Sequence, residues 1–252
     1  MADLNMVRTL LDWAERRTPF DEDGGPFANS RGAIDFSGAD LDYVDLHDAN
    51  LRRANFQGAR MSSANLRRAS LENANFANAE LEHADFHGDV NPGACLSDAI
   101  LTNANLRRAD LRRATLLNAD LSGANLQHAN LTNADLSNAN LTGANLRNAL
   151  LFGANLSGTV FFEADLTGVP QHQNGTGEKL DFKGAKLTQA IMPNGKRFAY
   201  PFWDVSEKND EELRFDRRST DKPERSPYEA LACLGCGGRD HPGYRCDGGL
   251  DI

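Results

Sequence analysis

The sequence predicts an all-β solenoid, in which short strands and corners alternate while the chain coils around a narrow core. Three observations lead to this prediction. Every fifth residue from Leu96 to Leu166 is Leu or Phe, and the same spacing extends backwards to Phe36. A small residue, nearly always Ala, lies two positions before each of them. The last two positions of a unit are mostly Gly, Asn, Ser, Thr or Arg, which suit turns and solvent.

A period of five excludes a long helix and a long strand. On an α-helix five residues advance about 500°, so successive Leu residues would spread around the cylinder. On a continuous strand they would alternate between the two faces, because five is odd. The chain must therefore bend within each unit. Ala and Leu then point inward, and the Asn or Asp between them points outward.

Units such as Ala144-Asn145-Leu146 followed by two turn residues resemble the pentapeptide-repeat family, over about residues 34–195. The resemblance implies a right-handed quadrilateral β-helix with four repeats per turn. Counting in fours predicts about seven coils and a rod ~33 Å long at ~4.8 Å per coil. On this count Phe36, Phe56 and Phe76 stack in one column, which Leu96 continues.

The repeat lapses once, at residues 89–93, where Asp89 and Asn91 stand at the Ala and Leu positions. Because the spacing resumes unshifted at Leu96, we expect one distorted side and not an inserted loop. Residues 168–179 are expected to form a loop. Phe182, Leu187 and Met192 then continue the repeat in a shifted register.

The chain divides into four predicted segments. Residues 1–30 are expected to form an amphipathic helix that caps the first coil, and residues 31–203 form the repeats with a C-terminal cap. Residues 204–227 are charged and poor in large apolar side chains, which predicts a flexible linker. Residues 228–252 hold a candidate zinc knuckle. The resemblance also implies, as an alternative to a monomer, an end-to-end homodimer of the kind that family members form, here through Phe198 to Trp203.

Composition narrows the function. The 252 residues carry a net charge of −9, which argues against direct nucleic-acid binding by the chain as a whole. No apolar run approaches the ~20 residues of a membrane span. Asp3 and Arg8 interrupt any signal-peptide core. A cytoplasmic protein is expected.

Three of the four cysteines lie close to the C-terminus in the spacing C-x2-C-x4-H-x4-C. Three thiolates and one imidazole make a complete tetrahedral set for zinc (Zn²⁺). The segment resembles a retroviral-type zinc knuckle, but Pro242 and the shortage of basic residues depart from the nucleic-acid-binding knuckles. Nucleic acid is therefore expected to bind at most weakly through the tail, and the alternative is a knob that docks a protein. The predicted metal ligands are Cys233, Cys236, His241 and Cys246.

The outward residues suggest a partner surface. Residues 31–169 hold sixteen acidic against eleven basic side chains. Some family members, the quinolone-resistance pentapeptide proteins, resemble B-DNA in shape and charge and occupy the DNA site of type II topoisomerases. The resemblance thus implies a non-catalytic protein that protects or inhibits DNA gyrase or topoisomerase IV by DNA mimicry. The simpler alternative is a charged wall that serves only solubility, and columns of paired Arg weaken the mimicry. The acidic face predicted by counting in fours carries Asp40, Asp42, Glu80, Glu82 and Asp120.

A cluster at one corner suggests an alternative function. With Ala84 and Phe86 inward, His83, Asp85 and His87 all face outward. Two His and one carboxylate could form the facial triad of a non-haem iron (Fe²⁺) enzyme. The simpler explanation is that outward positions accept any polar residue. A third alternative is a scaffold whose zinc knuckle recruits RNA or protein.

Overall fold

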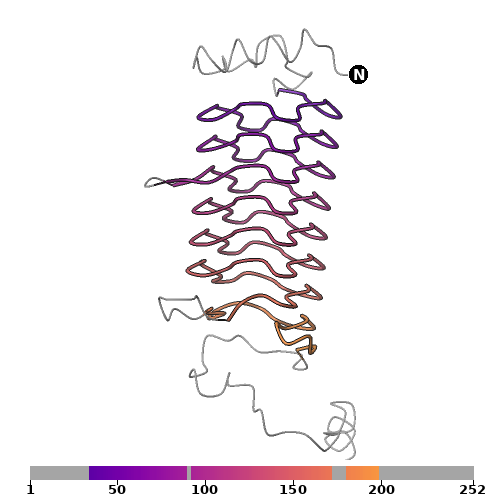
Figure 1. Cartoon of the computed structure of the whole chain (residues 1–252), viewed down its shortest axis with the longest axis vertical. Coiled ribbons are helices and arrows are strands. Elements are labelled where there is room, and N and C mark those ends of the chain that lie inside the picture. Colours follow the sequence, from indigo (N-terminus) through magenta and orange to yellow (C-terminus); the bar gives the residue numbers. More distant parts are fainter. Residues whose placement is uncertain (1–33, 90–91, 172–179, 199–252) are drawn as a thin grey trace, which may run out of the picture. The chain divides into compact units, whose positions relative to one another are not determined.

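The computed structural model describes residues 34–89, 92–171 and 180–198, which form a solenoid of stacked coils (Figure 1). These residues all lie in the first, Met1–Glu207, of the two units into which the chain divides. Within the described ranges the backbone pairs through single-residue parallel bridges in four ladders, one on each side of a coil. We name the sides in chain order by their first bridge: the first side begins with Asp35 and Asn55, the second with Asp40 and Arg60, the third with Asp45 and Asn65, and the fourth with Asn50 and Ser70.

Each corner is a tight turn that the repeat specifies. The carbonyl of Phe36 accepts the backbone N–H of Ala39 at 3.0 Å, and this pattern recurs in successive repeats. The residue before an inward Ala has positive φ in nearly every described repeat, as at Asn73 with φ 60°, which is typical of a type II turn. The outward Asp or Asn holds the corner, because its side-chain oxygen accepts a backbone N–H two residues on; Asp35 Oδ1 lies 3.0 Å from the Ser37 nitrogen.

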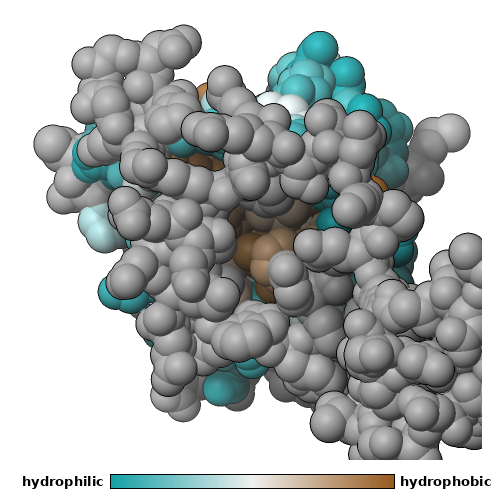
Figure 2. All heavy atoms as spheres, turned by 90° about the horizontal axis from the view of Figure 1, so that it is seen from below, coloured by the Kyte–Doolittle hydropathy of each residue, from teal (hydrophilic) through white to brown (hydrophobic). Residues whose placement is uncertain are grey.

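The inward Ala and Leu side chains fill the shaft completely. Leu106 and Ala124, for example, are 0% exposed. The predicted stack of aromatic rings is confirmed: the centroids of Phe36 and Phe56 lie 5.5 Å apart, and those of Phe56 and Phe76 lie 4.9 Å apart. Seen from below, apolar residues lie at the centre and hydrophilic residues around them (Figure 2). Among the described residues, the outer walls therefore carry the polar chemistry.

The prediction of a distorted side at residues 89–93 was wrong. The bridge spacing is twenty residues before this point and becomes twenty-five for one coil, with the pairs Ser70 and Cys95, Asn75 and Ile100, Glu80 and Asn105, and Asp85 and Asp110. The chain leaves the stack after Gly88 and rejoins it at Gly93, as the side-on view shows (Figure 1). Leu101 therefore follows Phe76 in its column, and not Leu96.

The physical reason is that the extra pentapeptide has nothing suited to the shaft. Asp89 and Asn91 stand in the sequence where the inward Ala and Leu belong, and Asp89 is exposed, which avoids the cost of burying its carboxylate. The junction is tight: the Ala94 N–H donates to the carbonyl of Phe86 at 2.8 Å, across the base of the loop. A side chain at position 93 would collide with that carbonyl, because a Cβ on Gly93 would lie 2.6 Å from its oxygen.

The predicted change of register at the second interruption is confirmed, but the loop was predicted to begin too early, because Val169 still occupies a buried repeat position and is 2% exposed. After residues 172–179 the repeat resumes in a new register, with Val160 bridged to Lys186. Leu187 and Met192 are buried, as the shifted spacing predicts. The ladder ends with an antiparallel bridge between Ile191 and Arg197. The predicted N-terminal helix, residues 199–203 of the cap, the linker and the zinc knuckle lie outside the described residues.

Candidate functional site

The third side of the solenoid carries a cluster of carboxylates around one histidine, His87. The side begins with Asp45 and passes through Asn65 and Asp85 to Asp110. The twenty-five-residue step brings Asp110 directly beside Asp85 in the next coil. With a uniform step of twenty, Asp85 would pair with Asn105 instead.

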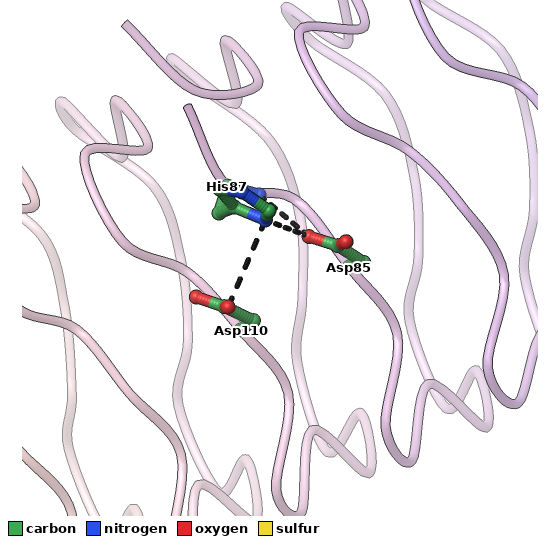
Figure 3. A group of neighbouring side chains, drawn as sticks. All are labelled: Asp85, His87 and Asp110. Atoms are coloured by element: carbon green, nitrogen blue, oxygen red, sulfur yellow. Dashed lines mark hydrogen bonds and ion pairs between the residues drawn. The ribbon is translucent and has the colours of Figure 1, made fainter. Parts of the chain in front are cut away.

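Both ring nitrogens of His87 face carboxylate oxygens. Nδ1 lies 2.6 Å from Asp85 Oδ1 and 3.7 Å from Asp110 Oδ2 (Figure 3). Nε2 lies 3.0 Å from Oδ1 of Asp89, the first residue of the extruded pentapeptide. The His87 side chain is only 13% exposed, whereas Asp85 and Asp110 are 35% and 29% exposed. The imidazole is thus held at the surface between three acids from two coils and a loop.

Two arginines balance the charge of this cluster. Arg112 holds Asp110 with Nε at 2.8 Å from Oδ1 and Nη2 at 2.6 Å from Oδ2. Arg67 pairs with Asp89. Burial alone would raise the pKa of Asp110, but hydrogen bonds from the side chain and backbone N–H of Arg112 outweigh it and place the pKa below its usual value. The hydrogen bond from His87 likewise lowers the pKa of Asp89.

The structure corrects the predicted set of His83, Asp85 and His87. The three residues whose ligand atoms lie within 4.8 Å of one another are Asp85, His87 and Asp110, and His83 is not among them. His83 occupies a corner with φ 61°, and its Nε2 lies 3.8 Å from Glu82 Oε1. His83 lies in the turn between the second and third sides, where the Ala84 N–H donates to the carbonyl of Leu81 at 3.0 Å. The sequence did not predict Asp110 as part of this site, because only the extra pentapeptide places it beside Asp85.

The predicted acidic face also changes. Four of its residues, Asp40, Asp42, Glu80 and Glu82, follow the second ladder, but Asp120 bridges Ile100 and Asn140 on the first side. The predicted grouping of Asp120 with the other four was therefore wrong. The same twenty-five-residue step explains the error.

The four acids of the second side make contacts between coils. Arg60 reaches Asp40 at 3.1 Å and Asp42 at 2.5 Å, and Arg107 reaches Glu82 at 2.5 Å. Glu80 accepts a hydrogen bond from Asn105 at 2.8 Å. This wall therefore presents a mosaic of paired charges. The predicted zinc ligands Cys233, Cys236, His241 and Cys246 lie outside the described residues.

A search of the described residues for a helix long and apolar enough to cross a membrane finds none.

Comparison with known proteins identifies the repeat. The family model described as "Pentapeptide repeats" matches in eight copies, over residues 33–68, 54–88, 93–127 and 129–168. A search of curated proteins gives no match.

Several solved structures of pentapeptide repeat proteins are similar to the chain. HetL, a protein involved in heterocyst differentiation regulation from the cyanobacterium Nostoc sp. strain PCC 7120, is 34% identical, with 65% of this chain and 74% of HetL covered and a TM-score of 0.30. Rfr23 from the cyanobacterium Cyanothece 51142 is 32% identical, with 52% and 85% covered and a TM-score of 0.31. QnrB1, a plasmid-mediated fluoroquinolone resistance protein, is 21% identical, with 61% and 82% covered and a TM-score of 0.42. Because the family model matches more than half of the chain, the chain belongs to the pentapeptide repeat family.

Proposed function

We propose that the protein is a non-catalytic interaction protein that binds a macromolecular partner against the walls of the solenoid. The observation that carries this proposal is the closed core. Inward side chains such as Leu121 and Ala124 are 0% exposed, so a partner meets only the walls. These walls are held in fixed register by the bridge ladders, which suits recognition by shape.

We further propose that the partner is a type II topoisomerase, DNA gyrase or topoisomerase IV, which the rod would engage as a mimic of DNA. The first ladder contains eight bridging residues, from Asp35 to Lys186. At ~4.8 Å per coil it extends ~34 Å, about one turn of B-DNA. The described residues hold seventeen Asp and Glu against fourteen Lys and Arg, which keeps the rod negative.

The ion pairs that arginines form on the second side affect how a DNA-binding partner could use this wall. Arg60 and Arg107 neutralise part of the second side, so a basic DNA-binding groove would have to compete with them for Asp42 and Glu82. The Asp42 and Glu82 side chains are partly sheltered, but both arginines lie at the surface, where an ion pair contributes about 0 to 1 kcal/mol, so a strongly basic partner could replace them. Neutralising these arginines should therefore strengthen an interaction that depends on mimicry.

A supercoiling assay tests the topoisomerase proposal. The protein is titrated into DNA gyrase or topoisomerase IV with and without a quinolone poison, and inhibition or protection is expected at micromolar protein. The variant that combines Asp40→Asn, Asp42→Asn, Glu80→Gln and Glu82→Gln should lose the effect. A control variant on the fourth side, Asp98→Asn with Asp135→Asn, should keep it. No effect of the wild-type protein at micromolar concentration would remove topoisomerases as the partner.

His83, Asp85 and His87 do not meet as a set of iron ligands, because the three residues whose ligand atoms lie within 4.8 Å of one another are Asp85, His87 and Asp110. Zinc binding by Cys233, Cys236, His241 and Cys246 remains a separate proposal, supported by their spacing. Metal analysis of the purified chain tests it. One equivalent of zinc that is lost when Cys233 and Cys236 are replaced by Ser would support the knuckle, and no zinc would exclude it. An electrophoretic shift with RNA would then show whether the knuckle recruits nucleic acid.

A further inference from the structure

We propose that Asp85, His87 and Asp110 form a binding site for a divalent transition-metal cation on the third side of the solenoid. This site is independent of the partner proposed above. Figure 3 shows the three side chains converging from two neighbouring coils. Their ligand atoms all lie within 4.8 Å of one another.

The donor set fits a cation of the manganese to zinc series. One imidazole nitrogen with two carboxylates suits Mn²⁺, Fe²⁺, Co²⁺ or Zn²⁺. It suits Mg²⁺ and Ca²⁺ less well, because these cations prefer ligands that are all oxygen. With metal–ligand bonds of about 2.1 Å, neighbouring ligand atoms lie about 3 Å apart or more. Nδ1 of His87 lies 2.6 Å from Asp85 Oδ1 and 3.7 Å from Asp110 Oδ2. A small rotation of Asp85 would therefore let one cation contact all three atoms.

Asp89 supplies an independent argument, because it occupies the other ring nitrogen. Metal-binding histidines usually donate their second N–H to a carboxylate or carbonyl, which fixes the tautomer and orients the ring. His87 Nε2 lies 3.0 Å from Asp89 Oδ1. A proton on Nε2 would be held there, while a cation between Asp85 and Asp110 would replace the proton that Nδ1 donates to Asp85 in the hydrogen bond of 2.6 Å. Asp89 is thus a positioning residue for the proposed site.

The same side contains a natural control two coils away. Asp45 and His47 repeat the local geometry of Asp85 and His87, with Nδ1 2.8 Å from the carboxylate. The bridging neighbour of Asp45 is Asn65, however, where Asp85 has Asp110. The His47 side chain is also 44% exposed. Of these two histidines, only His87 has a second carboxylate beside it and a side chain that is largely buried. The second carboxylate follows from the twenty-five-residue step.

Arg112 makes the affinity tunable. Arg112 donates hydrogen bonds to both oxygens of Asp110, so a cation must share this carboxylate with Arg112 or displace the arginine from it. Its positive charge also opposes that of the metal. Replacement of Arg112 by Gln should therefore strengthen metal binding several-fold, an effect opposite to that expected if the cluster were only a structural ion-pair network.

The experiment uses the full-length chain with Cys233→Ser and Cys236→Ser, so that the tail does not contribute. Mn²⁺ is titrated and its free signal is followed by electron paramagnetic resonance, with Zn²⁺ titration by calorimetry as a second probe. One site per chain is expected. His87→Ala or Asp110→Asn should weaken it at least tenfold, whereas His47→Ala and Asp45→Asn should leave it unchanged. Asp89→Asn should weaken it, and Asp89→Glu should restore it.

Circular dichroism and chemical unfolding establish that each variant is folded. The proposal is overturned if neither Mn²⁺ nor Zn²⁺ binds up to millimolar concentration. It is also overturned if folded His87→Ala and Asp110→Asn variants bind as the parent does, or if His47→Ala removes the binding. Tighter binding by Arg112→Gln, together with loss in Asp110→Asn, would support the assigned ligands.

Discussion

Gly93→Ala tests how the extruded pentapeptide rejoins the solenoid. A Cβ at this position would lie 2.6 Å from the carbonyl oxygen of Phe86 and 3.0 Å from both the Arg112 oxygen and the Ala114 nitrogen. These are backbone atoms inside bridged coils, so they cannot turn away as a side chain can. Relief requires the Ala94 N–H to move from the Phe86 carbonyl, which it now meets at 2.8 Å.

Overpacking costs about 1 to 3 kcal/mol and a lost hydrogen bond about 1, so Gly93→Ala should lower the free energy of unfolding by about 2 to 4 kcal/mol. The control is Gly143→Ala. Gly143 has φ +66° but nothing within 4 Å of the added Cβ. Only the left-handed backbone is then penalised, by about 1 kcal/mol. Urea unfolding followed by circular dichroism measures both. Equal losses for the two variants would refute the close approach at Gly93.

Three other predictions concern the core, the loop and pH. Phe56 lies at the centre of the aromatic stack, so Phe56→Ala should lower the free energy of unfolding by about 3 to 5 kcal/mol. Phe56→Leu should lower it by about 1 kcal/mol or less, since Leu fills this column in later coils. Similar losses for the two variants in urea unfolding would contradict the stack. Deletion of residues 89–93 joins Gly88 to Ala94 in an unbroken repeat. Unfolding should therefore stay cooperative, with a free energy of unfolding within about 1 kcal/mol of the parent. An unfolded product would contradict the extrusion of this pentapeptide. Because the pKa of Asp110 lies below its usual 3.8 when folded, its carboxylate stabilises the fold above that value and the benefit is lost as the pH falls through the folded pKa. The stability difference between wild type and Asp110→Asn should therefore be largest near neutral pH and disappear in acid, and a constant difference would contradict this cause.

Local features of the fold could be predicted because they repeat within five residues. The inward Ala and Leu, the corner after each unit and the stack of Phe36, Phe56 and Phe76 all follow from alternation and turn chemistry. The order of the sides beyond residue 93 could not. An extruded pentapeptide leaves the spacing of five unchanged, so the sequence period does not show that one pentapeptide lies outside the coil.

The candidate site shows the consequence of that ambiguity. Asp85 and His87 were found from the sequence, but His83 was grouped with them by strand alternation that ignores the corner between them. Asp110 was missed, since it joins Asp85 only through the longer coil. The available signal was physical: Asp89 and Asn91 are costly to bury, and Pro92-Gly93 favours a turn.

The register of the twenty-five-residue coil can be measured directly through the native Cys95. Cys95 is free and bridges Ser70, whereas a uniform step of twenty would place it beside Asn75. Parallel neighbours ~4.8 Å apart lie within the range of about 4.4 to 6.8 Å that a disulfide spans. With the tail cysteines changed to Ser, mild oxidation followed by peptide mapping should show a Cys95 disulfide in Ser70→Cys and none in Asn75→Cys. A disulfide in Asn75→Cys and none in Ser70→Cys would contradict the register and separate Asp110 from Asp85 and His87.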